Sequence, residues 1–342
     1  MILTSLAILL LAGFLYERAG EFRDRRRFPP PGRIVRVNIS PGSRSKPLRL
    51  HVNEQGQGEP CVIFESGIAA SSLSWTFVQP EVAKLTRTIS YDRAGLGWSD
   101  PCRIPRTLHD ILSELDALLR AAAIPGPYLL VGHSFGGLLI RAWAARHPDQ
   151  VAGLVFVDPV SLTYWSHCSR HEERRLILGA SFARRGKWLA RFGVVRAALA
   201  ALTGRGAALS RFIGKTTARE AMGTLERMTA EIRKLPPATW PIIRSHWSGS
   251  KCMAALGAYL RCLPQAAREA SAMPLPRHIP FIILSAANAT EAELAERNSW
   301  VQQSEAGRHE IVPGAGHWIP LECPNAIISA VEELLQGVRK NS

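Results

Sequence analysis

The sequence predicts an α/β fold, in which a mostly parallel sheet has helices on both faces and one α-helical insertion. Short apolar stretches alternate with segments of helical periodicity, which is the pattern of parallel strands joined by helices. This alternation stops over residues 159–278, which are helix-like apart from Gly and Pro interruptions. A chain of 342 residues, 46% of them apolar, can bury a large core and is too apolar to be disordered.

The expected elements follow one another in a regular order. Residues 34–39 and 48–52 predict an opening hairpin, and further strands are expected at residues 61–64, 88–91, 128–131, 153–157, 281–284 and 309–312. Residues 108–122 have apolar side chains at helical spacing, and Thr107 before them is a typical N-cap. Pro324 stands where the first turn of a helix tolerates proline, ahead of a helix over residues 327–335.

The most specific motif is Gly132-His133-Ser134-Phe135-Gly136. It follows the strand at residues 128–131 and precedes a helical stretch, so it predicts a strand, a sharp turn and a helix. The outer glycines suit a tight turn in which a Cβ would clash with neighbouring backbone. Ser134 is therefore the predicted nucleophile, with its hydroxyl held above the C-terminal edge of the sheet.

A serine hydroxyl needs a base to remove its proton, and the base needs an acid to orient it. His317, in the loop beyond the last predicted strand, is the candidate base. Two acids remain open. Asp158 directly follows the strand at residues 153–157. Glu291 comes after the strand at residues 281–284, and Asn288, which lies between that strand and Glu291, cannot serve as the acid because its side chain has no charge. Asp158 is favoured, because a triad is defined by geometry and not by chain position.

Hydrolysis through a tetrahedral intermediate also requires an oxyanion hole made of two N–H donors. The N–H of Phe135, directly after the predicted nucleophile, is one candidate. The second is the N–H of Ile68, in the loop after the strand at residues 61–64, where Gly67 lets the backbone come close.

Four stretches together resemble the α/β-hydrolase superfamily, in its cofactor-independent serine hydrolase branch with a helical cap. They are Glu65-Ser66-Gly67, the segment from Tyr91 to Ser99 (YDRAGLGWS), Gly132 to Gly136, and Gly316-His317. They occur in the order of that superfamily and span about residues 34–338. The resemblance implies an eight-stranded sheet, and it implies that the segment after Tyr91 shapes the floor of the active site. The acid usual after the penultimate strand is missing.

The expected domains are an N-terminal hydrophobic anchor with a basic, Pro-containing linker (1–32), a hydrolase core (33–158 and 279–342) and a helical cap (159–278). A cap of this kind excludes water and shapes the substrate pocket. Its larger apolar residues are expected chiefly to pack its helices, and some of them to line the pocket: Trp188, Leu189, Phe192, Trp240, Trp247 and Leu260.

The positive charge of the chain is concentrated in the predicted cap. Residues 161–275 contain nineteen Lys or Arg and six Glu, a net +13, whereas the whole chain has +14. Three interpretations stay open: attraction to an anionic membrane surface, an anionic substrate, or a solvated basic face without a partner. Nucleic acid is not expected, because no nucleic-acid motif accompanies the charge.

The N-terminus favours the membrane. Residues 2–16 are apolar apart from Thr4 and Ser5, and as a helix they would extend about 22 Å, against about 30 Å for the hydrocarbon core of a bilayer. Basic residues follow this run, which predicts a membrane anchor with the catalytic unit on the cytoplasmic side. Export through a signal peptide is the alternative, although no basic residue precedes the run. The basic residues concerned are Arg18, Arg23, Arg25, Arg26 and Arg27.

No cofactor is expected, since the sequence has no phosphate-binding loop or dinucleotide fingerprint. No metal is expected either, because His167 and His171 lack a third ligand of suitable spacing. The predicted function is cleavage of a lipophilic ester with an apolar acyl group, through an acyl-enzyme intermediate. Hydrolysis of an amide, a thioester or a carbon–carbon bond by the same residues is one alternative. A binding protein that kept the fold without catalysis is another.

Overall fold

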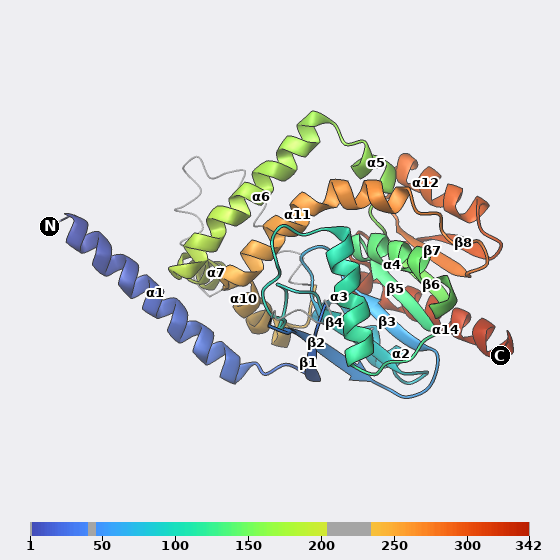
Figure 1. Ribbon diagram of the computed structural model, residues 1–342, viewed down its shortest axis with the longest axis horizontal. Helices are drawn as coiled ribbons and strands as arrows, with labels where there is room; N and C mark the ends of the chain where they lie inside the picture. The colour runs from blue at the N-terminus through green and yellow to red at the C-terminus, as the bar shows by residue number, and fades with distance from the viewer. Residues whose placement is uncertain (1, 40–45, 204–233, 342) are drawn as a thin grey trace.

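A computed structural model of the chain describes residues 2–39, 46–203 and 234–341 (Figure 1). Eight strands form one sheet in the order β1-β2-β4-β3-β5-β6-β7-β8. The pairs β1–β2 and β2–β4 are antiparallel, and all other neighbours are parallel. The predicted mostly parallel sheet and its opening hairpin are therefore confirmed. The strands are β1 (Arg33–Val37), β2 (Leu48–Gln55), β3 (Cys61–Glu65), β4 (Thr88–Asp92), β5 (Tyr128–His133), β6 (Val151–Val157), β7 (Phe281–Ala286) and β8 (Gly307–Val312).

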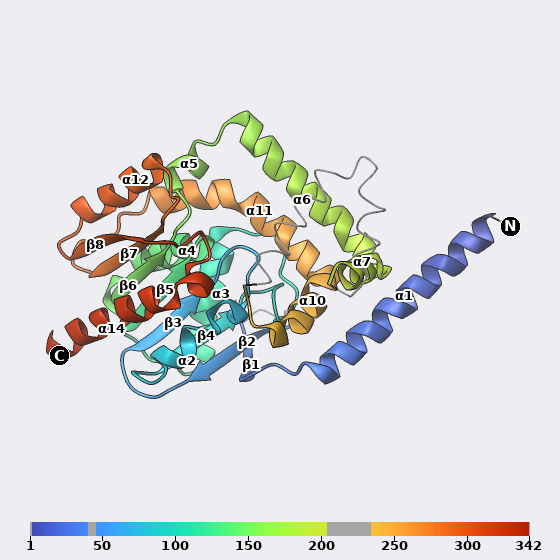
Figure 2. The same ribbon diagram turned by 180° about the vertical axis from the view of Figure 1, so that it is seen from behind.

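Alternate residues of the central strands supply two separate apolar cores, one on each face of the sheet. Ile63 and Leu130 point to the face covered by α3 (Leu108–Ala121), α4 (Phe135–Arg146) and α12 (Glu291–Gln302). Val62 and Leu129 point to the opposite face, where α2 (Gln79–Val82) and α14 (Pro324–Asn341) pack (Figure 2). The strands β3, β4, β5 and β7 are buried along their whole length and therefore on both faces, as the interior of a parallel sheet requires.

The start of α3 follows the sequence prediction. The Thr107 hydroxyl accepts a hydrogen bond from the backbone N–H of Asp110, and the Asp110 carboxylate accepts one from the backbone N–H of Thr107. This reciprocal pair satisfies two N–H groups that a helix start leaves without acceptors.

Between β6 and β7 the described residues form helices and no strands, and residues 204–233 of the predicted cap lie outside the described part. The helices are α5 (Leu162–Ser166), α6 (Arg170–Arg191), α7 (Val194–Thr203), α10 (Trp240–Ser248) and α11 (Ser250–Ser271). The helices α6 and α11 pack closely, since a Cβ on Gly257 would lie 3.1 Å from the carbonyl oxygen of Ala180. The Tyr259 hydroxyl of α11 donates to the carbonyl of Ala94, 3.0 Å away, and so joins α11 to the core.

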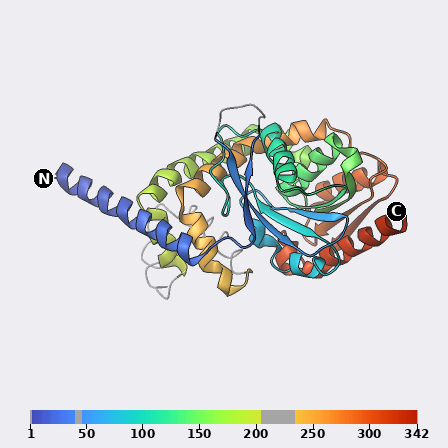
Figure 3. The ribbon, with the colours of Figure 1, turned by 60° about the horizontal axis from the view of Figure 1, so that its bottom comes forward.

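The first helix, α1 (Ile2–Arg27), extends away from the body of the protein, as Figure 3 shows. Its apolar part ends where Glu17 and Arg18 begin a charged part of the same helix. Across residues 2–39, 46–203 and 234–341 no helix combines the length and apolar character needed to cross a bilayer. A form of the expected membrane anchor that spans the bilayer therefore gains no support from the described residues.

Candidate active site

The turn between β5 and α4 has the geometry of a nucleophile elbow. Ser134 has φ 56° and ψ −118°, a left-handed conformation that is costly for a residue with a side chain. A Cβ on Gly132 would lie 2.6 Å from the Gly136 carbonyl oxygen, and one on Gly136 would lie 2.3 Å from the Glu65 carbonyl oxygen. Both glycines are therefore needed for close backbone contact, as the motif predicts.

Ser134 and His317 line the same cavity, of about 310 Å³. Ser134 is 8% exposed, and its hydroxyl forms no hydrogen bond with any residue that the structure describes. His317 lies in the loop after β8 and has a half-exposed side chain. The two predicted partners are thus brought together from positions 183 residues apart, with the serine hydroxyl open to a ligand.

The acid beside His317 is Asp158. Its Oδ2 lies 2.6 Å from the Nδ1 of His317, and its Oδ1 accepts hydrogen bonds from the Ala286 N–H at 3.0 Å and from Arg297 at 2.9 Å. Burial raises the pKa of Asp158, but the hydrogen bond from His317 and the charge of Arg297 outweigh burial, so that the net shift is downward. The carboxylate is therefore ionised near neutral pH.

The alternative acid does not reach the histidine. Glu291 is the first residue of α12 and is exposed, and no hydrogen bond or ion pair joins it to His317 in the described part of the chain. Asn288 is also exposed, in the turn after β7. Of the two acids left open by the sequence, the structure places Asp158 at the imidazole.

Two neighbours of this group were not anticipated from the sequence. Arg297 is 3% exposed on α12 and donates to Asp158, to the Ser285 hydroxyl and to the Pro159 carbonyl. The Nε2 of buried His133 lies 2.7 Å from the carbonyl oxygen of His317. Because a carbonyl oxygen only accepts hydrogen bonds, this nitrogen carries the proton. Burial and the neighbouring His317 lower the pKa of His133 to about 3, which keeps the ring neutral. The histidine within the elbow motif was the only sequence signal for either contact.

The predicted oxyanion donors flank the same serine. Phe135 is the first residue of α4, and the first N–H groups of a helix have no acceptor within it. Ile68 lines the cavity beside Ser134. A Cβ on Gly67 would lie 3.3 Å from the Nδ1 of His133, which shows how close this loop comes to the elbow.

A buried ion pair holds the loop that contains Ile68. Arg93 forms an ion pair with Glu65 and donates to the carbonyls of Ser66, at 2.6 Å, and of Gly67. Since the C=O and N–H of a trans peptide point in opposite directions, the N–H of Ile68 points away from Arg93. The segment after Tyr91 thus supports the loop that lines the cavity beside Ser134.

The rest of the cavity is mostly apolar. Its apolar side chains come from the core loops and from the cap: Leu73, Leu235, Ile243, Trp247, Trp318 and Leu321. Of the six cap residues considered from the sequence, Trp247 alone is among the described lining residues, while Trp188 and Leu189 are exposed on α6. The polar residues of the described lining are three serines and two histidines, and none of the lining residues is an Asp, Glu, Lys or Arg: Ser71, Ser74, Ser134, His133 and His317. A cavity of this kind suits an uncharged, lipophilic group.

Comparison with known proteins gives the class. Residues 62–330 match the Alpha/beta hydrolase family, and the chain belongs to that family. It is 34% identical over 107 residues to the uncharacterized protein YqjL of Bacillus subtilis, covering 31% of this chain and 42% of the relative. It is 33% identical over 121 residues to a haloalkane dehalogenase of Sphingobium indicum, and the match covers 34% of this chain and 40% of the dehalogenase. The matches thus span less than half the length of these relatives.

Solved structures share the fold over nearly the whole chain. A thermophilic esterase from Thermogutta terrifontis has a TM-score of 0.62 at 20% identity, covering 90% of this chain and 99% of the esterase. A putative epoxide hydrolase from Pseudomonas aeruginosa has a TM-score of 0.63 at 18% identity, and the match covers 91% of this chain and 98% of the epoxide hydrolase. These likenesses confirm the α/β-hydrolase fold.

Proposed function

We propose that this protein is a serine hydrolase that cleaves a carboxylic ester through an acyl-enzyme intermediate. The observation that carries the proposal is the contact between His317 and Asp158 in the cavity that Ser134 lines. An ionised acid on one ring nitrogen leaves the other nitrogen free to accept the serine proton, and it stabilises the imidazolium that forms.

In the proposed mechanism, Ser134 Oγ attacks the substrate carbonyl while His317 removes its proton. The N–H groups of Phe135 and Ile68 stabilise the oxyanion. His317 then protonates the leaving alcohol, and water repeats the sequence to release the acid and restore the serine. The apolar walls around Trp247 would hold the acyl group.

The residue at the elbow favours acyl transfer over other reactions on this fold. Attack of a serine oxygen on a carbonyl gives an ester, which water and the same imidazole can hydrolyse. Attack on an alkyl carbon, as a halide or epoxide substrate would require, gives an ether that does not turn over in this way. Amides and thioesters remain substrates that the same residues can process. The non-catalytic alternative loses its main support, because an acid does contact His317.

A fluorophosphonate probe tests the proposal directly. The wild-type protein should be labelled at Ser134, and a Ser134→Ala protein should not. On an ester series of increasing acyl length, Asp158→Asn should lower kcat by about 10⁴, while the matched variant Glu291→Gln should retain wild-type kcat. An unlabelled wild-type protein, or loss of activity only in Glu291→Gln, would contradict the assignment.

A further inference from the structure

Most exposed apolar side chains gather at one end of the molecule. Of the nineteen large apolar side chains exposed in the described part of the chain, fourteen lie on α1, α6 and α7. The exposed fraction reaches 69% for Leu9 and 68% for Leu178. These helices lie at the same end of the protein in Figures 1 and 2, and α1 contacts α6. The fourteen are Leu6, Ile8, Leu9, Leu10, Leu11, Leu15, Tyr16, Phe22, Ile177, Leu178, Phe182, Trp188, Leu189 and Val194.

The first half of α1 is apolar on every side. Its consecutive residues from Ile8 to Leu11 are all exposed, and four consecutive helical residues cover the whole circumference. A helix that is apolar all round belongs in an apolar core or in lipid, because apolar side chains are stabilised when they leave water. Water alone is therefore an unfavourable environment for this segment.

Arginines border these apolar side chains. The exposed arginines of α6 are Arg170, Arg174, Arg175, Arg184, Arg185 and Arg191, and those of α1 are Arg18, Arg23, Arg25, Arg26 and Arg27. Arg191 lies over the ring of Trp188, 5.9 Å from its centroid. Arginine and tryptophan beside apolar residues are typical of the headgroup level of a membrane. A second copy of this chain would place like charges together, whereas an anionic bilayer has the opposite charge.

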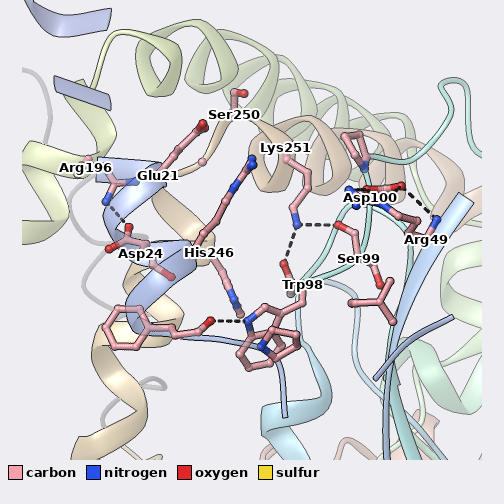
Figure 4. A pocket seen from close by; sticks show the side chains of 18 of the residues that line it. Glu21, Asp24, Arg49, Trp98, Ser99, Asp100, Arg196, His246, Ser250 and Lys251 are labelled. Carbon is pink, nitrogen blue, oxygen red and sulfur yellow. Dashed lines mark hydrogen bonds and ion pairs between the residues drawn. The ribbon is translucent and has the colours of Figure 1, made fainter. Parts of the chain in front are cut away.

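The helix α1 is docked and not a loose tether. Arg196 of α7 pairs with Glu17 at 2.8 Å and with Asp24 at 2.5 Å. Trp98 Nε1 donates to the carbonyl of Phe28, 3.0 Å away. Figure 4 shows the place where α1 meets the loop after β4 and the helices α10 and α11, around a cavity of about 510 Å³. Ion pairs thus hold α1 against the cap helix α7, and a hydrogen bond joins the residue after α1 to the loop after β4.

We infer that the exposed face of α6 and the first half of α1 form a membrane-binding surface for anionic lipid. The apolar half of α1 inserts into the hydrocarbon, and the arginines of α1 and α6 contact lipid phosphates and carboxylates. This inference is independent of the proposed reaction, because it concerns a different part of the molecule.

Flotation of the full-length protein with vesicles tests the inference. The wild type should float with vesicles that contain about one-third phosphatidylserine, and less with pure phosphatidylcholine. The pair Leu9→Glu and Leu11→Glu should require about tenfold more lipid. Arg184→Gln with Arg185→Gln should weaken binding to the anionic vesicles only. A matched control, Ile104→Glu with Ile311→Glu, changes exposed apolar residues elsewhere and should bind as the wild type does.

Three results would overturn the inference. The wild type could remain unbound by both vesicle types, or the Leu9 and Leu11 variant could bind as tightly as the wild type. Alternatively, light scattering without lipid could show a dimer that this variant dissociates, which would make the surface an interface between copies. Circular dichroism and hydrolysis of a short soluble ester verify that each variant is folded.

Discussion

At the scale of single residues, the active site depends on side chains that hold backbone in place. Asp158 contacts His317 with one oxygen, while its other oxygen binds the Ala286 N–H and Arg297. His133 fixes the carbonyl of His317 itself. His317 is thus positioned by residues to which the proposed mechanism gives no bond-forming role. Preorganisation of this kind decides how well a site stabilises a transition state.

Arg93 is expected to act through the Ile68 peptide. Arg93→Lys keeps the charge beside Glu65 but loses the simultaneous hydrogen bonds to the Ser66 and Gly67 carbonyls. Since one misplaced oxyanion donor costs about 10²–10³ in kcat, we expect kcat to fall by that order with little change in KM. Steady-state kinetics, normalised to the fraction labelled by the fluorophosphonate probe, measures this. If the Arg93→Lys variant has a lower Tm but the same kcat per labelled site, Arg93 contributes to stability only and does not position the Ile68 N–H.

At the scale of elements, the elbow is the part of the site that the sequence predicts best. Its strand, turn and helix are contiguous, so the pattern from residue 128 to residue 144 contains the whole unit. The contacts of Arg93 with Gly67 and of Arg297 with Asp158 join segments that are distant in sequence and were not predicted. Only the packing of α12 against β6 and β7 brings Arg297 to the acid, and no local pattern records that packing.

The close approach of α4 to the loop after β3 predicts a strong effect at Gly136. In Gly136→Ala the new Cβ would lie 2.3 Å from the Glu65 carbonyl oxygen, so backbone must move. We expect a loss of about 1–3 kcal/mol or more in the free energy of unfolding. Gly337→Ala is the matched control, because a Cβ there meets nothing within 4 Å, and it should stabilise α14 by up to about 1 kcal/mol. Chemical denaturation of both variants provides the measurement, and equal stabilities would refute the argument.

At the scale of the whole molecule, two histidines are expected to make stability depend on pH. Burial lowers the pKa of His133 to about 3 and that of His246 to about 4, so both stay neutral in the folded protein. In the unfolded chain each gains a proton near pH 6.5. Their contribution to stability is complete above about pH 6.5 and is lost as the pH falls toward 4.

His246→Gln isolates one of these contributions. The gap in unfolding free energy between the wild type and this variant should shrink by up to about 2 kcal/mol between about pH 7.5 and 5. Denaturation curves at both pH values measure the gap. A gap that is constant with pH would show that His246 has the same pKa in the folded and unfolded protein, so that burial does not lower it.

The fold as a whole was predictable because the strand and helix patterns repeat along the core. The predicted helix over residues 108–122 ends within one residue of α3, and each predicted strand overlaps an observed one. The length of α1 was less evident, because the apolar run stops at Tyr16 while the helix continues to Arg27. Arginine and glutamate favour helix as readily as leucine does, so the change of polarity does not end it.

The position of Asp158 at the end of β6 has a consequence for how this protein can be modified. Because Asp158 contacts the His317 imidazole, the turn after β7 does not need to supply an acid there. The tip of this turn, at Asn288, is exposed. A reporter peptide or an affinity handle is therefore best spliced in at Asn288 itself, beyond the N–H groups of Ala286 and Ala287, which bond to Asp158 and to the Ala315 carbonyl and should stay in place.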